Sequence, residues 1–244
     1  MKKIFLKTIE EDGVRMMRNK NENISVIIRI KNEEQWIGHA IQSILDNIKS
    51  PEIIIIDNNS TDNSLNIVNN FKQDEKLEIK KNNNYTKIRV FNIKDYSPGK
   101  SLNLGVKKAS NNNILIISSH CVLININLEK HISDLRKYVC VFGKQNPIWF
   151  GKKITKRYIW SHFTNKKIVN MFSKLENRYF LHNAVAFYQR KFLMKNPFNE
   201  NLTGKEDRYW AELIIKKNKS FLYDPAIEVN HHYTPNGNTW KGIG

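Results

Sequence analysis

The 244-residue sequence has only two cysteines, Cys121 and Cys140, which are too few for a disulfide framework. No apolar run approaches the roughly 20 residues that a membrane-spanning helix needs. Residues 1–17 contain lysines and acids but no sustained apolar stretch, so we do not interpret them as a signal peptide. These absences predict a cytoplasmic protein in which the cysteines serve as buried packing.

Two glycine-rich phosphate-binding motifs are also missing. The sequence has only 10 glycines, with no Walker A motif and no G-x-G-x-x-G that opens a helix. These absences disfavour P-loop nucleotide hydrolases and dinucleotide-dependent oxidoreductases.

Acidic residues are scarce, with 23 Asp and Glu against 40 Lys and Arg, and the formal net charge is +17. Nucleic-acid binders usually cluster their basic residues and interleave aromatics, whereas lysine here is spread along the whole chain. We therefore do not expect nucleic acid as a partner. The charge is either a solvated surface, or it serves anionic ligands or peripheral contact with anionic lipid at the inner membrane face.

Buried strands and amphipathic helices alternate in the first half of the chain, and right-handed crossovers would make these strands parallel. Strands are predicted at 24–30, 52–57, 87–93 and 112–118, and helices at 32–48 (capped by Asn32), from 65 onward and at 97–110. The second half is more aromatic. Its predicted elements are a helix near 127–137, strands at 138–143 and 183–189, a helix at 203–218 and a strand pair at 220–233 broken at Asp224-Pro225.

Polar residues directly follow three of the predicted strands. They are Arg29, Lys31 and Asn32 after the first strand, Asp57, Asn59 and Ser60 after the second, and Ser118, Ser119 and His120 after the strand at 112–118. Ligands of open parallel sheets bind at the carboxyl ends of the strands. A carboxylate can accept from a base N–H, and basic side chains can meet phosphate oxygens, so this set suits a nucleotide.

Several segments in order resemble the family 2 glycosyltransferases of GT-A fold. These segments are NISVIIRIKNEEQWIGHAIQSIL, EIIIIDNNSTDNSLNIV, YSPGKSLNLGVKKASNNNILIISSHC, FNENLTGKEDRYWAELIIKK and YDPAIEVNHH, which together span about residues 23–233. Within the family, the chain looks most like the bacterial rhamnosyltransferase-like enzymes that build surface polysaccharides.

The resemblance implies one GT-A domain over residues 1–244. Its fold class is α/β, with a Rossmann-like half at about 23–143 whose mostly parallel sheet has helices on both faces and binds the nucleotide sugar. A decorated half at about 144–244 would bind the acceptor and complete the catalytic site. The activity implied is inverting transfer of a sugar from a nucleotide-activated donor to a hydroxyl of a glycan or lipid-linked acceptor.

The resemblance also assigns roles to particular residues. The segment 29–33, which includes Glu33, would line the base pocket, and Asp57 would bond the base or ribose. Lys100 and Asn103 would contact the nucleotide from the side. Glu206 and Asp207 match the family's acidic pair, in which Asp207 would be the general base, because a neutral hydroxyl is a poor nucleophile.

One departure from the family concerns the metal. Most members have Asp-x-Asp at the end of the fourth strand, where this chain has Ser118-Ser119-His120. Mg²⁺ prefers oxygen ligands, whereas imidazole binds transition metals. Either His120 and His231 share a divalent cation (Mn²⁺ or Mg²⁺) with the donor phosphates, or His120 itself stabilises the leaving phosphate.

Simpler interpretations stay open for these residues. Loss of the acidic triplet also suits a degenerate, non-catalytic member that only binds a nucleotide sugar or glycan. His182 and Asn183 either touch the sugar or acceptor or start a strand, and the aromatic stretch 148–180 is either an acceptor cleft or packing. Trp36 and Trp210 are predicted core residues.

Overall fold

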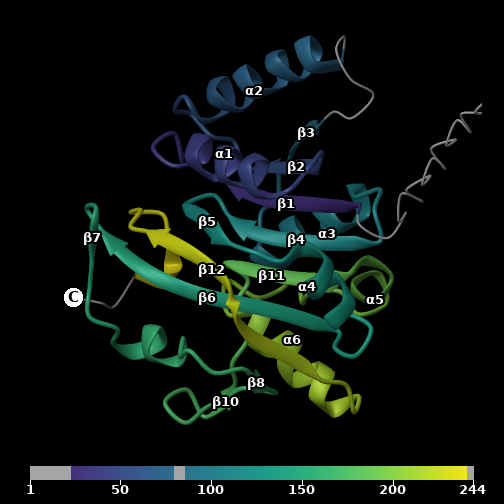
Figure 1. The fold of residues 1–244 in the computed structure, drawn as a ribbon, viewed down its shortest axis with the longest axis vertical. Coiled ribbons are helices and arrows are strands. Elements are labelled where there is room, and N and C mark those ends of the chain that lie inside the picture. Colours follow the sequence, from purple (N-terminus) through teal and green to yellow (C-terminus); the bar gives the residue numbers. More distant parts are fainter. Residues whose placement is uncertain (1–22, 80–85, 241–244) are drawn as a thin grey trace, which may run out of the picture.

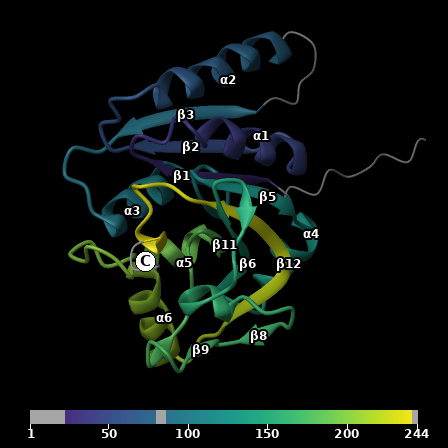
Figure 2. The same ribbon diagram turned by 90° about the vertical axis from the view of Figure 1, so that its left-hand side faces the viewer.

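The computed structural model describes residues 23–79 and 86–240. The first half builds four parallel strands in the order β3-β2-β1-β4. The elements are β1 (Ile24–Ile30), α1 (Ile37–Asn47), β2 (Glu52–Asp57), α2 (Ser64–Ile79), β3 (Lys87–Asn92), α3 (Pro98–Lys108) and β4 (Asn113–Ser118). Their isoleucine runs are buried on both faces, as strands covered by helices on both sides must be. Apolar residues of α1 and α2 pack on one face and those of α3 on the other (Figures 1 and 2).

The second half extends this sheet with strands of mixed direction. β11 lies antiparallel between β4 and β6, and β12 lies parallel to β6 and antiparallel to β5. The strands and helices are β5 (Cys121–Asn125), α4 (Leu128–Asp134), β6 (Cys140–Trp149), β7 (Lys152–Lys153), β8 (Ile168–Val169), β9 (Phe172–Ser173), β10 (Arg178–Tyr179), β11 (Val185–Gln189), α5 (Arg190–Lys195), α6 (Glu206–Lys216) and β12 (Phe221–His232). Two 3₁₀ turns, η1 (Tyr158–His162) and η2 (Asn238–Trp240), complete them.

The predicted α/β class and mostly parallel central sheet are confirmed, but several local predictions are wrong. The helix expected at 32–48 begins only at Ile37, and Asn32 does not cap it. Asn32 instead takes a left-handed backbone (φ 51°), donates its N–H to Ser60 Oγ and accepts from the Thr61 N–H. It therefore ties the end of β1 to the loop that follows β2.

Two strand boundaries also differ from the prediction. The expected strand pair at 220–233 is the single strand β12, with a register shift between Asp224 and Glu228, where Pro225 cannot donate to the ladder. The strand expected at 138–143 continues to Trp149, and β5 was not expected at all. These strands pair with distant parts of the chain, so the local sequence pattern does not predict where they begin and end.

The core residues agree in part with expectation. Trp210 is 2% exposed and packs in the core, and both cysteines are buried free thiols whose pKa burial raises. Trp36 is only half-buried, so its prediction as a core residue is wrong. Its ring stacks on His232 at 4.0 Å, and its N–H donates to the Tyr233 carbonyl. None of the described helices combines the length and apolar character that a membrane crossing requires.

Candidate active site

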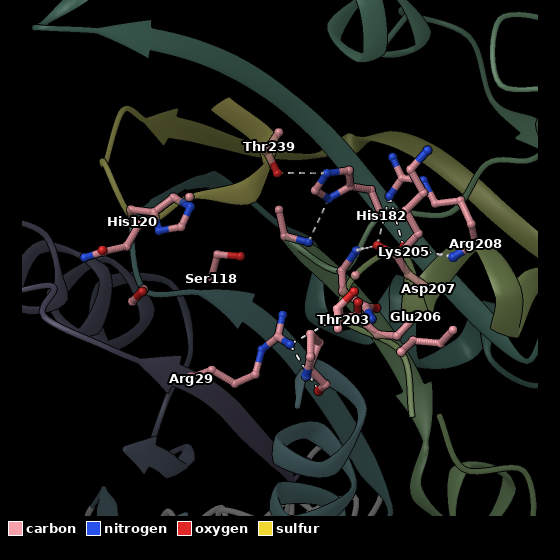
Figure 3. A pocket seen from close by; sticks show the side chains of 18 of the residues that line it. Arg29, Ser118, His120, His182, Thr203, Lys205, Glu206, Asp207, Arg208 and Thr239 are labelled. Atoms are coloured by element: carbon pink, nitrogen blue, oxygen red, sulfur yellow. Dashed lines mark hydrogen bonds and ion pairs between the residues drawn. The ribbon is translucent and has the colours of Figure 1, made fainter. Parts of the chain in front are cut away.

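A cavity of about 770 Å³ lies at the carboxyl ends of β1 and β4, opposite the first turn of α6. Figure 3 shows Arg29, Ser118 and His120 on one side of it and Glu206, Asp207 and Arg208 on the other. Eight of the predicted site residues line this cavity: Arg29, Lys31, Glu33, Ser118, Ser119, His120, Glu206 and Asp207. The topology therefore brings together residues that are up to 178 positions apart in the sequence.

The other predicted residues lie outside the cavity wall. Asp57 is 1% exposed and accepts from the Ser60 N–H, while the Asn59 carbonyl accepts from Lys31 Nζ at 2.6 Å. These bonds hold the loop after β2 beside the end of β1. The donor-binding roles of Asp57, Asn59, Ser60 and Asn32 stay predictions.

Lys100 and Asn103 lie on α3, also away from the cavity wall. Lys100 forms a surface ion pair with Asp95. The buried Asn103 amide bonds both the N–H and the carbonyl of Phe198, at 3.0 and 2.9 Å. Asn103 therefore anchors the segment before α6 to α3, and for both residues a contact with nucleotide stays a prediction.

The acidic pair opens α6, where the helix dipole favours negative charge. Glu206 Oε1 lies 3.3 Å from a guanidinium nitrogen of Arg29, which links α6 to the end of β1. Burial raises the pKa of Glu206, and the charge of Asp207 reinforces this shift while Arg29 opposes it. Arg29 thus faces both a carboxylate and the cavity.

Asp207 is 5% exposed and is held by two neighbours. Its Oδ2 accepts from the Asn183 N–H at 3.0 Å, and Arg208 Nη1 donates to both carboxylate oxygens at 3.0 Å. Burial alone would raise the pKa of Asp207, but Arg208 and the Asn183 N–H hold it below its ordinary value. Asp207 is therefore ionised and fixed in orientation at neutral pH.

Arg208, His182 and Asn183 complete the site, and sequence reasoning gave Arg208 no role. The Arg208 guanidinium also donates to the Leu181 carbonyl at 3.1 Å and lies 4.5 Å from the centre of the Phe180 ring. Only its place directly after the acidic pair could have signalled it. Asn183 Nδ2 is buried without a hydrogen-bond partner, and Asn183 lines the cavity.

His182 is neutral in this environment. Its Nδ1 accepts from the Ala184 N–H at 3.2 Å, so its ring proton is on Nε2, which faces Thr239 Oγ1 at 3.3 Å (Figure 3). Burial and the charge of Arg208 lower the pKa of His182 to about 3. His182 is therefore set up to donate one hydrogen bond at the cavity wall.

His120 and His231 lie side by side, with ring centres 4.8 Å apart. His120 lines the cavity, and its Nδ1 lies 3.4 Å from Glu33 Oε1 without hydrogen-bond geometry. His231 is fully buried, bonds Gln145 Oε1 through Nδ1 at 2.8 Å, and has no partner at Nε2. Burial and the neighbouring histidines lower the pKa of His231 well below its ordinary value. His231 thus supports the His120 ring from behind the cavity wall.

The sequence profile of glycosyl transferase family 2 matches residues 25–196, which is most of the chain and includes the β1, β2 and β4 ends described above. The chain belongs to glycosyl transferase family 2. This family 2 chain is 25% identical over 217 residues to a GalNAc(5)-diNAcBac-PP-undecaprenol beta-1,3-glucosyltransferase of Campylobacter jejuni, covering 84% of the chain and 63% of the relative. It is 26% identical over 218 residues to the O-antigen chain rhamnosyltransferase RfbN of Salmonella typhimurium, covering 81% and 64%. The chain spans 26% to 64% of the length of the curated relatives it matches.

Two solved structures share the fold of this family 2 chain. S. aureus TarS 1–349 in complex with UDP-GlcNAc superposes with a TM-score of 0.67 at 17% identity, covering 91% of the chain and 62% of TarS. GalNAc-T7 with UDP, GalNAc and Mn²⁺ superposes with a TM-score of 0.62 at 17% identity, covering 88% and 44%. The expected GT-A fold is thereby confirmed.

The residues of this chain do not fit the Mg²⁺ site that the fold family implies. The end of β4 supplies two hydroxyls and an imidazole, and Mg²⁺ requires an oxygen-rich octahedron. His120 Nδ1 lies 3.4 Å from Glu33 Oε1, but among the described residues Glu33, His120 and His231 do not form a group whose ligand atoms all lie within 4.8 Å of one another. Within residues 23–79 and 86–240, the group whose ligand atoms lie within 4.8 Å of one another is His131, Asp134 and Asp224.

That second group lies between α4 and β12, away from the cavity, and lysine ammonium groups already neutralise it. Lys130 Nζ contacts both carboxylates, and Lys167 Nζ lies 3.1 Å from Asp224 Oδ2. We therefore assign no metal to this second group, and a transition metal shared by His120 and His231 stays a prediction.

The buried histidines predict loss of stability in mild acid. The pKa values of His131 and His182 are lowered to about 4 and about 3, mainly by burial. Unfolded histidine has a pKa of about 6.5, so below that pH the unfolded chain binds protons that the folded chain refuses. The histidines therefore contribute their whole stabilisation above about pH 6.5, and the free energy of unfolding falls as the pH drops below it. Glu206 opposes this trend, because its raised pKa lets the folded chain bind one proton that the unfolded chain binds only at lower pH.

Urea titrations at about pH 7.5 and pH 5 measure this effect. The free energy of unfolding should be lower at pH 5 by at least about 2 kcal/mol, the contribution of one such histidine. The variant His131→Leu should reduce the pH dependence of the free energy of unfolding by up to the equivalent of one bound proton. Equal free energies at the two pH values would contradict the assignment of neutral buried histidines.

Proposed function

We propose that the protein is an inverting glycosyltransferase that moves a hexosyl or deoxyhexosyl group from a nucleotide sugar to a hydroxyl of a glycan or lipid-linked saccharide in surface polysaccharide biosynthesis. The observation that carries this proposal is the buried, ionised Asp207 facing a cavity whose opposite wall holds Arg29 and His120. A general base and an anion-binding wall on either side of one cavity are what a single displacement at a sugar carbon needs.

The donor is expected to lie along the carboxyl ends of β1 and β4. Its base would reach toward Asp57, and its diphosphate toward Arg29, Lys31 and His120. A guanidinium binds phosphate oxygens through paired hydrogen bonds, and it does so without a divalent cation. The sugar would then lie in the centre of the cavity, within reach of the unpartnered Asn183 Nδ2 and of His182 Nε2.

The reaction follows from this placement. The acceptor hydroxyl attacks C1 of the sugar from the side opposite the diphosphate, and its proton passes to Asp207. The new C1–O bond forms as the C1–O bond to phosphate breaks, the electron pair leaves with the diphosphate, and the configuration at C1 inverts. Arg208 and the Asn183 N–H hold Asp207 in position during this transfer.

The acceptor class is suggested by the relatives, since the Campylobacter protein acts on an undecaprenol-linked saccharide and the Salmonella protein on an O-antigen chain. Because lipid-linked acceptors lie in the membrane, we propose a cytoplasmic location with peripheral contact at the inner membrane face. A degenerate, non-catalytic family member that binds a nucleotide sugar or a glycan is the rival hypothesis. It has no need of an ionised carboxylate fixed by two neighbours inside the cavity.

A thermal-shift panel of UDP, GDP, dTDP and CMP sugars tests the proposed donor site. A ligand that binds only the folded state raises the melting temperature by mass action. We expect one nucleotide class to raise it equally in EDTA, Mg²⁺ and Mn²⁺, and His120→Ala to weaken that donor's affinity. No shift with any donor would oppose the proposal, and a shift that requires Mn²⁺ would restore a metal shared by His120 and His231.

A further inference from the structure

The basic charge is less evenly distributed than the composition indicates. No Asp or Glu occurs between Asp134 and Glu176, whereas ten basic residues do. They are Arg136, Lys137, Lys144, Lys152, Lys153, Lys156, Arg157, Lys166, Lys167 and Lys174. One continuous stretch of the chain is therefore purely cationic.

The same stretch carries most of the large apolar side chains that the fold leaves exposed. Of the eleven such side chains among the described residues, six lie between positions 149 and 175. They are Trp149, Phe150, Tyr158, Val169, Phe172 and Leu175. Exposed apolar groups and positive charge thus occur together in this stretch of the chain.

The β6–β7 hairpin presents the most exposed of these groups at a rigid tip. Its two-residue turn, Phe150-Gly151, has φ values of 43° and 79°, as the tight primed turns require. Phe150 is 72% exposed and Trp149 39%. The Trp149 ring rests on Tyr233, with ring centres 4.1 Å apart, so the tip is supported from below.

The hairpin projects beyond the edge of the sheet at which the cavity opens. β11 pairs Phe142 of β6 with Ala186 and Ala186 with Ile116 of β4, so Lys144 is level with the end of β4 at Ser118. Trp149 lies five residues farther along β6, about 16 Å at the rise of a strand. Figure 1 shows β7 at this far end of β6.

Four cations follow the two aromatic rings in the chain. These are Lys152, Lys153, Lys156 and Arg157, and no carboxylate among the described residues lies within ion-pair distance of them. Lys156 Nζ donates to the Phe163 carbonyl at 2.9 Å, and burial and the charge of Lys144 lower its pKa while Glu228 opposes this shift. Lys152, Lys153 and Arg157 are thus exposed to solvent, where an anionic surface can attract them.

We propose that the β6–β7 hairpin, residues 148–157, docks the protein on an anionic lipid bilayer. Trp149 and Phe150 enter the interface, where aromatic rings are preferred, and Lys152, Lys153 and Arg157 meet the headgroup phosphates. A bilayer fits better than nucleic acid, because the aromatic rings form a projecting tip, whereas bases stack on platforms inside a groove. This docking does not depend on the proposed transferase activity, since it uses no residue of the cavity.

Vesicle flotation tests the docking with the whole chain. Wild-type protein should float with vesicles of phosphatidylcholine and phosphatidylglycerol and much less with phosphatidylcholine alone. The double variant Lys152→Ser/Lys153→Ser should lower vesicle affinity on the order of 10- to 30-fold, and Phe150→Ser should lower it roughly tenfold. Quenching of tryptophan fluorescence by brominated lipid should be largely lost in Trp149→Phe.

Matched variants on α5 serve as controls. α5 directly follows β11, and β11 runs antiparallel to β6, so α5 lies at the end of these strands opposite to the hairpin. Lys191, Met194 and Lys195 are exposed there. Lys191→Ser/Lys195→Ser and Met194→Ser should bind vesicles like the wild type. Equal loss in both sets, no preference for anionic lipid, or oligonucleotide binding without vesicle binding would overturn the proposal. Unchanged melting temperatures establish that each variant is folded.

Discussion

Replacing Asp207 with asparagine is expected to lower the rate of sugar transfer by about 10²- to 10⁴-fold, the range typical of general acid–base catalysis. The asparagine side chain has nearly the same shape and still accepts from the Asn183 N–H, but it cannot take the proton of the acceptor hydroxyl. Donor affinity should change little, because Arg29 and His120 lie on the opposite wall.

Two measurements on the same variant separate binding from chemistry. Calorimetric titration with the donor found in the thermal-shift panel gives its affinity, and release of nucleoside diphosphate in the presence of acceptor gives the rate. Glu206→Gln serves as the comparison, because Glu206 pairs with Arg29 at 3.3 Å and is assigned no proton transfer. Transfer by Asp207→Asn at a rate near that of the wild type would remove Asp207 from the role of base.

Replacing Arg208 with glutamine is expected to lower the free energy of unfolding by about 3–5 kcal/mol, the usual result of removing one partner of a buried ion pair. Asp207 would keep its charge in a buried site but lose the guanidinium that donates to both of its oxygens. For a chain of this length the melting temperature should fall by roughly 10 °C.

Denaturant titration and calorimetry measure this loss. Arg208→Lys keeps the charge but not the paired geometry and should lie between glutamine and the wild type. Arg136→Gln is the matched control, because Arg136 is exposed and should change stability by less than about 0.5 kcal/mol. A loss below about 1 kcal/mol for Arg208→Gln would show that the Asp207–Arg208 pair contributes little.

Much of the first half of the fold could be predicted from the sequence. The isoleucine runs of β1, β2 and β4 are continuous because both faces of the sheet are covered, and that pattern is visible without a structure. Because ligands of such sheets bind at the carboxyl ends of the strands, residues such as Arg29 and Ser118 are expected to lie together, and both line the cavity. Local patterns sufficed here because each strand is followed by its own helix.

The second half could not be predicted as well, because its strands pair with distant partners. β5 is short and half exposed, and only its pairing with the end of β12 makes it a strand. Arg208 illustrates the same limit within the site. Its contacts with Leu181 and Phe180 depend on how α6 packs against the segment before β11. The spacing of residues in the sequence does not indicate that packing.

The composition alone does not show where the basic residues lie on the fold. Exposed lysines occur throughout the described residues, and on the β6–β7 hairpin Lys152 and Lys153 adjoin exposed aromatic rings. Segment 148–180, which the sequence predicts to be an acceptor cleft or packing, is packing only in part, and its role as an acceptor cleft stays a prediction. Trp160 and Phe163 pack in the core, Ile159 lines the cavity, and Trp149 and Phe150 project from the fold.

The central claim is that the cavity between the β1 and β4 ends and α6 binds a nucleotide-sugar donor without a divalent cation. A crystal structure with the nucleotide of highest affinity, grown in EDTA, tests it most directly. We expect the base beside Asp57, the diphosphate oxygens within hydrogen-bond distance of Arg29 and His120, and Asp207 facing the sugar position. Nucleotide bound elsewhere, or bound only when Mn²⁺ is added and held by His120 and His231, would contradict the account.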